Sequence, residues 1–308
     1  YTGGGCPHIL AEPMRTNLLT YSEDLSQWNV KQAAETLNYG ISPDGTQNST
    51  RIVFASSNLQ FSNIFTTVTP TTGSIYIKGV NGETITFGLD SSENVFTLNG
   101  SWQRFEKSGT STSNKITINT FGGATARDIQ VWGAQVENGS YATSLIPTSG
   151  STVTRNQDIF TRDGIGSLIN STEGVLFLEM AALSDDGTNR YLTLTNGTTN
   201  ERVALLFSAN SNELRAIIFS STQSINISFT TSSYSVLNYN KIAIRYKSGE
   251  YAFYVNGTSI GTNTSSSVFT VNTLNRLAFD VGSGSLNLFA KVKQLQVYDT
   301  SLSDEQLL

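Results

Sequence analysis

One predicted strand near residue 130 carries an aromatic ring and an amide that could bind a sugar. The strand 129–132 reads Ile-Gln-Val-Trp, and alternate residues of a strand point to opposite faces. If the two apolar residues face a core, Gln130 and Trp132 lie together on the outer face, although a bulge at Gly133 could reverse this. An aromatic ring can stack on the apolar side of a pyranose while an amide bonds its hydroxyls. Packing of the Trp132 ring is the alternative interpretation, and both stay open.

Two tyrosines occupy comparable positions on other predicted strands. Tyr76 and Tyr254 alternate with apolar neighbours, so their rings point away from the predicted cores. An exposed ring there can serve either a ligand or a surface between protein copies. Tyr76 and Tyr254 therefore join Trp132 and Gln130 as candidate carbohydrate-binding residues.

Residues for catalysis are sparse. A glycosidase needs two carboxylates about 5–9 Å apart, and the strand predicted at 175–181 offers only Glu179, with Asp185 following in a turn. The single histidine, His8, stands near the single cysteine, Cys6, without a third catalytic group. These residues favour a non-catalytic protein. An enzyme whose carboxylates meet only in three dimensions stays an alternative, with Glu179 and Asp185 as the first residues to test.

The composition argues against several classes of function. Only 14% of residues are charged, below the roughly 25% of an average soluble protein, and Ser, Thr, Asn and Gly replace them. A net charge of −5 provides no basic footprint for nucleic acid. No apolar run is long enough to insert into a membrane. The chain opens at Tyr1 without an initiator Met, so we expect a processed part or a fragment of a longer polypeptide.

Periodicity and turn residues predict an all-β protein of two tandem antiparallel β-sandwiches of the jelly-roll type. Short strands separated by Asn-Gly, Gly-Gly and Pro-Asp-Gly turns fill residues 16–147, and further strands fill residues 159–308. Residues 148–158 lack an apolar period and are predicted to form a linker. Residues 1–15 are rich in Gly and Pro, and we expect them to form an extended arm along the first sandwich.

The second sandwich carries a recognisable hairpin. Residues 241–257 read as two alternating strands, and Asn256-Gly257 suits a tight turn. The stretch resembles the concanavalin A-like (laminin-G-like) jelly-roll family, in which a Tyr-Val-Asn-Gly strand end is common. Residues 292–308 are similar to the last strand and Leu-Ser-Asp-Glu-Gln-Leu ending of such modules, with Ser303 as the cap of a short helix. The resemblance implies a lectin-type or structural sandwich over residues 160–308.

The first sandwich carries a separate signature. Residues 16–28 contain Thr-Asn-Leu-Leu and Ser-Glu-Asp-Leu-Ser-Gln-Trp, and residues 132–147 contain Trp-Gly-Ala-Gln-Val-Glu and Ala-Thr-Ser-Leu-Ile-Pro. Both are similar to motifs of the N-terminal sandwich in bacteriophage tail and fibre proteins, with Leu25 and Leu145 replacing the usual Phe and Tyr. The resemblance covers residues 1–155 and implies a virion component.

The same residues are more distantly similar to jelly-roll carbohydrate-binding modules. Many of those hold a structural calcium ion between the first and last strands, and by position Glu23 and Asp128 are the matching carboxylates. Backbone carbonyls would complete the oxygen shell. Arg127 stands where that family has the first Asp of a pair. The resemblance implies a candidate calcium site at Glu23 and Asp128, with surface, capping or ion-pair roles as the alternative.

The observations together predict a non-catalytic virion fibre or adhesin-type protein that presents glycan-binding or structural β-sandwich modules for host attachment. We expect a homo-oligomer, often a trimer in such proteins, located on the virion surface. Its expected partners are host polysaccharide and other virion proteins, without nucleic acid or membrane insertion. A purely structural virion decoration protein without a ligand is one alternative. A secreted or cell-surface bacterial adhesin is another.

Overall fold

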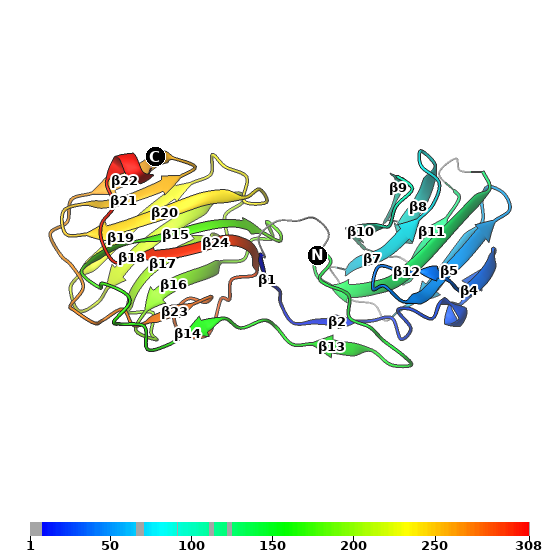
Figure 1. The fold of residues 1–308 in the computed structure, drawn as a ribbon, viewed down its shortest axis with the longest axis horizontal. Coiled ribbons are helices and arrows are strands. Elements are labelled where there is room, and N and C mark those ends of the chain that lie inside the picture. Colours follow the sequence, from blue (N-terminus) through cyan, green and yellow to red (C-terminus); the bar gives the residue numbers. More distant parts are fainter. Residues whose placement is uncertain (1–7, 66–70, 91, 111–113, 122–124, 308) are drawn as a thin grey trace. The chain divides into compact units, whose positions relative to one another are not determined.

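The computed structural model describes residues 8–65, 71–90, 92–110, 114–121 and 125–307. Strands are the main regular structure of these residues, and every ladder between strands is antiparallel (Figure 1), which confirms the all-β prediction. The chain divides into two compact units. We call residues 13–157 the inserted sandwich, and residues 1–12 with 158–308 the C-terminal sandwich.

The inserted sandwich consists of two sheets packed face to face. Its strands are β3 (Val30–Lys31), β4 (Ala34–Ile41), β5 (Gln47–Phe54), β6 (Gln60–Ile64), β7 (Thr71–Lys78), β8 (Thr84–Leu89), β9 (Ser92–Thr97), β10 (Gln103–Gly109), β11 (Lys115–Asn119) and β12 (Arg127–Asn138). One sheet has the order β10-β7-β12-β5-β4 and the other β3-β6-β11-β8-β9. Alternate residues of both sheets enter one core, among them Ile52, Ile77 and Val131 from the first sheet. The 3-10 turn η1 (Leu25–Gln27) adds Leu25 to that core.

The C-terminal sandwich has the same plan of two facing sheets. Its elements are β1 (Ile9–Ala11), β14 (Thr161–Arg162), β15 (Glu173–Ala182), β16 (Arg190–Thr195), β17 (Glu201–Phe207), β18 (Leu214–Ser220), β19 (Ile225–Thr231), β20 (Asn240–Lys247), β21 (Tyr251–Val255), β22 (Thr258–Asn263), β23 (Arg276–Ala278), β24 (Ala290–Tyr298) and the helix α1 (Asp304–Leu307). The sheet orders are β1-β24-β15-β20-β21-β22 and β14-β23-β16-β17-β18-β19. Their facing side chains form a single core.

The predicted hairpin of the C-terminal sandwich is confirmed. β20 pairs with β21, and β21 pairs with β22 across Asn256-Gly257. Both turn residues have positive φ, 51° and 77°, as a two-residue hairpin turn with the twist of its strands requires. The Asn256 side chain adds to the turn, because its Oδ1 accepts a 2.9 Å hydrogen bond from Lys241 N.

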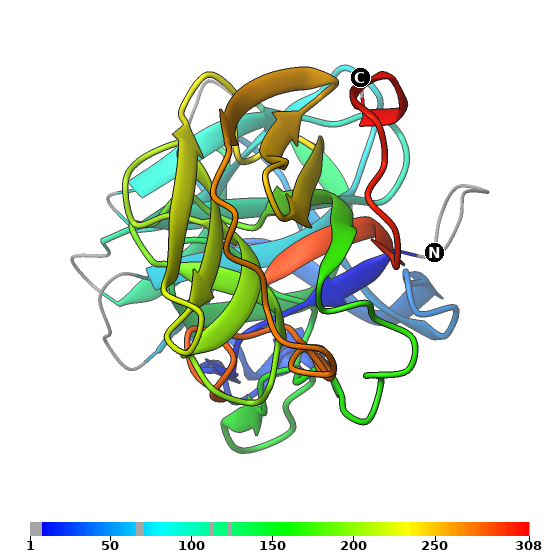
Figure 2. The same cartoon turned by 90° about the vertical axis from the view of Figure 1, so that its left-hand side faces the viewer.

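The predicted position of the N-terminal arm along the first sandwich is wrong. β1 pairs with β24 and so forms an edge strand of the C-terminal sandwich, where Figure 2 shows it in blue beside β24. Ala11 is fully buried in that core. The chain leaves this sandwich and re-enters it at one point, since Glu12 and Asp158 exchange hydrogen bonds of 2.9 Å. The residues between them are thus an insertion, and the two sandwiches are not simply consecutive.

The predicted linker also takes part in the fold. β2 (Arg15–Asn17) pairs with β13 (Val153–Arg155) in a two-stranded ribbon. Arg15 of β2 is the last residue of the predicted arm, Thr16 and Asn17 belong to the predicted first sandwich, and β13 lies in the predicted linker, 148–158. The segments where the chain enters and leaves the inserted sandwich thus satisfy each other's backbone groups. Because they have no apolar period, the sequence pattern did not predict these two strands. Within the described residues, the structure has no helix with the length and apolar character to cross a membrane.

The place of β1 can be tested by charging it. Ala11→Glu would bury a carboxylate in the core of the C-terminal sandwich and should lower its free energy of unfolding by about 3 kcal/mol. Leu10→Glu is the matched control, because Leu10 is 41% exposed. All three tryptophans lie in the inserted sandwich, so fluorescence assigns the other calorimetric transition to the C-terminal sandwich. An equal effect of both variants would contradict the placement.

Candidate functional site

A bulge in β12 determines which side chains lie on the outer face of the sheet β10-β7-β12-β5-β4. Ile129 and Val131 enter the core. The register with β7 then shifts at Gly133, whose φ is +63°, and the core continues with Ala134 and Val136. An extra residue at a bulge changes which residues face inward. The outer-face residues of β12 are Asp128, Gln130, Trp132, Gln135 and Glu137.

One end of this outer face is covered by residues 139–150, which we call the strap. The Trp132 and Tyr76 rings pack at 5.4 Å between centroids. Arg104 lies over Tyr76 at 5.5 Å and donates a 2.6 Å hydrogen bond to the carbonyl of Thr143 in the strap. Trp132 is only 6% exposed and Tyr76 is partly buried. Of the two interpretations of Trp132, its burial supports packing of the ring rather than ligand stacking.

Two buried side chains of β12 hold the strap in place. Glu137 accepts hydrogen bonds from both the backbone N and the Oγ1 of Thr143, and Gln135 Oε1 accepts one of 2.6 Å from Ile146 N. Burial raises the pKa of Glu137, while the bonds from Thr143 and Gln135 and the nearby Arg15 act in the opposite direction. A polar network without access to water is stable only when its members are satisfied, so these contacts specify one strap position.

The other end of the outer face is open. A groove of about 390 Å³ is lined by Tyr39, Lys78, Asp128 and Gln130, among others. Tyr39 is 46% exposed. The hydroxyl of Ser49 shares its single hydrogen between the Gly40 carbonyl, at 2.9 Å, and Gln130 Oε1, at 3.1 Å, and the NH₂ group of that amide can donate to a ligand. An aromatic ring, an ammonium, a carboxylate and an amide thus border a single groove.

An arginine fork organises this groove. Arg51 Nε and Nη2 donate to Asp128 Oδ1 and Oδ2 at 2.8 and 2.5 Å. The guanidinium also lies 5.1 Å from the centre of the Tyr39 ring. The hydrogen bonds from Arg51, and then its charge, lower the pKa of Asp128. Two parallel charge-assisted bonds restrict both side chains, so the ring and the carboxylate keep a defined relation. This is an arrangement that a sugar can use, with a flat apolar surface beside fixed polar groups.

Tyr254 is not available for a ligand. The alternation is as predicted, because Tyr254 joins Val175 and Ala243 on the outer face of its sheet. Its hydroxyl, however, donates a 2.7 Å hydrogen bond to Asp304 of α1, and the residue is only 2% exposed. Arg245 binds the same Asp304 oxygen at 2.6 Å. The expectation of an exposed Tyr254 ring is wrong, because the C-terminal segment covers that face.

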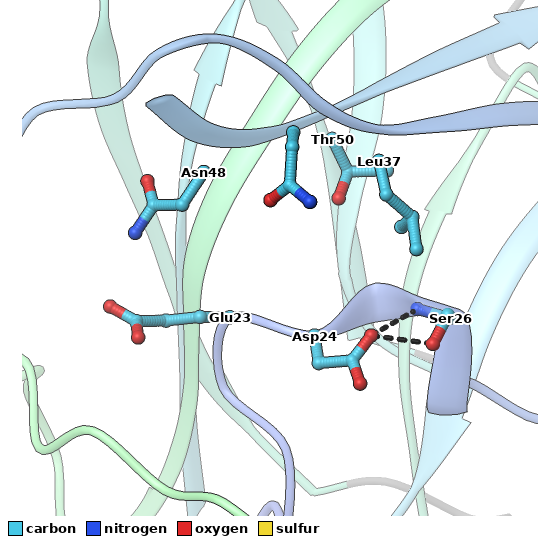
Figure 3. Close-up of a pocket in the computed structure, with 7 residues that line it drawn as sticks. Glu23, Asp24, Ser26, Leu37, Asn48 and Thr50 are labelled. Carbon is cyan, nitrogen blue, oxygen red and sulfur yellow. Dashed lines mark hydrogen bonds between the residues drawn. The ribbon is translucent and has the colours of Figure 1, made fainter. Parts of the chain in front are cut away.

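The two candidate calcium ligands line different grooves. Glu23 lines a groove of about 300 Å³ together with Asp24, Asn48 and others (Figure 3). Asp128 lines the groove described above, and both of its oxygens accept from Arg51. Burial and the charge of Asp44 raise the pKa of Glu23. Within the described parts of the chain, no group of three or more acidic, His or Cys side chains could hold a metal. Asp128 has the ion-pair role, and calcium binding stays a prediction.

The family comparison concerns the C-terminal sandwich. Residues 177–308 match the family model described as the Concanavalin A-like lectin/glucanases superfamily. The antiparallel sheet order of this half agrees with that match, and the predicted concanavalin A-like fold is confirmed. The search of curated proteins found no match.

Solved structures show distant similarity. The CBM40 module of the Ruminococcus gnavus IT-sialidase bound to α2,3-sialyllactose is 15% identical, covering 48% of this chain and 96% of its own, with a TM-score of 0.40. Sheep galectin-11 in complex with glycerol is 10% identical, covering 46% and 99%, with a TM-score of 0.32. Domains LG4-5 of the mouse laminin α1 chain are 10% identical, covering 98% and 96%, with a TM-score of 0.31.

Sequence reasoning missed Tyr39 and Arg51. Tyr39 lies on the edge strand β4, whose pairing with β5 shifts register twice, so a strict period of two does not assign its face. Arg51 alternates with the core residue Ile52, and that alternation could have placed it on the outer face. Its partner Asp128 is 77 residues away, and no local pattern reports such a pair.

The raised pKa of Glu137 predicts a pH dependence of the inserted sandwich. Because the folded state binds this proton more tightly, its contribution is fully present below pH 4.5 and is lost as pH rises through the folded-state pKa. The difference in unfolding free energy between the wild type and Glu137→Gln should therefore fall with rising pH. Urea unfolding followed by tryptophan fluorescence measures it. Glu35→Gln, which removes a carboxylate bonded to Lys31 at the surface, is the control. A pH-independent difference would contradict the prediction.

The calcium hypothesis predicts a different result. If Glu23 and Asp128 hold calcium, EDTA should lower the melting temperature of the inserted sandwich and Asp128→Asn should abolish that response. Because Arg51 donates to both Asp128 oxygens, calcium would have to displace Arg51 to bind there, and an unchanged melting curve would contradict the hypothesis. Tryptophan fluorescence during heating measures this. A downward shift that Asp128→Asn removes would show that calcium displaces Arg51.

Proposed function

We propose that this chain is a non-catalytic, glycan-binding protein whose β-sandwich modules serve attachment to a host surface. The observation that carries the proposal is the open groove of the inserted sandwich, with Tyr39 46% exposed beside Asp128 and Gln130. The match of residues 177–308 to a lectin-containing superfamily supports a carbohydrate role for the second module.

The groove accounts for sugar binding in simple physical terms. The Tyr39 ring supplies an apolar surface for the C–H face of a pyranose, and Arg51 limits the motion of that ring. Asp128 can accept hydrogen bonds from sugar hydroxyls, while the NH₂ group of Gln130 can donate one. A shallow groove of this kind binds weakly by itself. Several copies on one particle would raise the avidity by making each further contact intramolecular.

We further propose that the protein is a homo-oligomeric component of a bacteriophage virion, exposed at its surface as a fibre or adhesin. Support comes from the two motifs in residues 16–28 and 132–147. In the structure, Gln135 and Glu137 of the second motif bind the strap that the same motif continues into. The residues of the second motif therefore hold the strap against the outer face of this sandwich. A structural decoration protein without a ligand and a secreted bacterial adhesin are the alternatives.

The carboxylates considered for hydrolysis have other contacts. Glu179 forms an ion pair of 3.2 Å with Lys293. Asp185 accepts hydrogen bonds from the hydroxyl of Ser211 and the backbone N of Asn212. These contacts support the non-catalytic proposal. A glycan-degradation assay tests it, with Glu179→Gln and Asp185→Asn as the variants to examine if any product appears.

A glycan array with the purified protein tests the binding proposal. We expect selective retention of one class of neutral polysaccharide, and Tyr39→Ala should weaken binding about tenfold, corresponding to about 1.4 kcal/mol of lost stacking. Tyr39→Phe should retain most of the affinity, because the ring remains. Leu37→Ala, which removes an exposed side chain of the same strand that lines the other groove, is the control. A folded protein without retention on the array would favour the structural decoration alternative.

A further inference from the structure

Two arginines lie on the outer face of the second sheet of the C-terminal sandwich. Along β17, Val203 and Leu205 enter the core, so Arg202 points outward. Arg215 of β18 is outward for the same reason, because its neighbour Leu214 lies in the core. Among the described residues, no ion pair to a carboxylate is found for either arginine, which separates them from most arginines of the chain.

Arg202 lies in an apolar setting. Its guanidinium is 5.8 Å from the ring centre of Tyr191 and 5.9 Å from that of Phe219. Tyr191 belongs to a small cluster of buried apolar residues on this face, and Phe219 packs against it. The polar contact of the guanidinium is a long one, 3.5 Å from Nη1 to the carbonyl of Val281. Its Nε is buried and has no acceptor in the described part of the chain. The fork is thus held between two rings with most of its hydrogen-bonding capacity unused.

The surroundings disfavour this positive charge when no ligand is present. Burial lowers the pKa of Arg202, the nearby Tyr191 opposes that shift in part, and the like charge of Arg215 adds a smaller lowering. Removing a charge from water without a counter-ion costs free energy. The contrast within the chain is clear, since Arg51 and Arg190 each have a bidentate carboxylate partner. An external anion would give Arg202 the carboxylate partner that Asp128 gives Arg51.

We propose that this outer face binds the carboxylate of an acidic sugar at the Arg202 fork, while Arg215, which pairs with Leu206 four positions along β17 from Arg202, adds a positive charge farther along the same face. The planar guanidinium matches a carboxylate through two parallel hydrogen bonds. The Tyr191 and Phe219 rings restrict the guanidinium, which lowers the ordering cost of binding. Arg215 is itself oriented, because its Nε donates a 2.9 Å hydrogen bond to the hydroxyl of Ser228. The inference rests on the proposed glycan-binding function for its ligand class, but it concerns a different sandwich.

Matched pairs of ligands test the proposal on the full chain. Calorimetric titration compares α2,3-sialyllactose with lactose, and tri-galacturonic acid with its methyl ester. We expect at least one acidic ligand to bind ten times more tightly than its neutral counterpart, and added salt to reduce that preference. Arg202→Gln should reduce acidic-ligand affinity at least tenfold and Arg215→Gln by a smaller factor, whereas Arg202→Lys should retain part of it. Arg162→Gln, an exposed arginine of the same sandwich, is the control for net charge.

A second measurement separates binding from a structural role. Arg202→Met keeps the apolar stem over the cluster and removes the unpaired charge, so its melting temperature without ligand should equal or exceed that of the wild type. The acidic ligand should raise the melting temperature of the wild type but not that of Arg202→Met. Equal affinity for both members of each pair would overturn the proposal, as would unchanged affinity in Arg202→Gln. Retention of neutral glycans on the array tests the Tyr39 groove, whereas the difference in affinity between acidic and neutral ligands tests Arg202. Either proposal can therefore be contradicted without the other.

Discussion

The inserted sandwich depends on one constraint in β12, which must place apolar side chains in the core both before and after its bulge. Val131 and Ala134 both face inward although three positions separate them, because Gly133 adopts a φ of +63°. A Cβ at this position would come within 3.0 Å of a Leu145 methyl group, so strain and crowding both select glycine. The bulge keeps the polar residues before and after it on one outer face. That face can then hold both a covered end and an open end.

The covered end shows why a motif can be informative about fold and silent about ligand. Trp132, Gln135 and Glu137 have the side chains expected of a sugar site, namely a ring, an amide and a carboxylate. Their partners are instead the strap and Tyr76. Buried polar groups of this kind must be satisfied by the protein itself, and they give the strap a unique position. The groups left for a ligand lie beyond the strap, around Tyr39 and Asp128.

The insertion of one sandwich into the other has a similar physical basis. A sheet edge exposes unpaired backbone groups, and β1 covers the edge of β24 in the C-terminal sandwich. The hydrogen bonds between Glu12 and Asp158 then hold the two chain crossings together. The N-terminal residues thus complete a sandwich whose remaining strands come from the far end of the sequence. Arg51 and Arg202 each lie beside aromatic rings on an outer sheet face, and of these two arginines Arg51 alone has a carboxylate partner within the described residues.

The sequence by itself determined the all-β class, the two sandwiches, the hairpin at Asn256-Gly257 and the outward direction of Gln130, Trp132 and Tyr254. Those properties follow from a side-chain period of two and from turn chemistry, which are local. Only the tertiary structure decided which outward side chains meet solvent. The strap covers Trp132, and the C-terminal helix covers Tyr254. The strap is an irregular segment and the helix is distant along the chain from Tyr254, so no local pattern predicts either contact. The tertiary structure also paired Arg51 with Asp128 and left Arg202 without a carboxylate partner among the described residues, because charge pairing depends on packing between strands rather than on spacing within one.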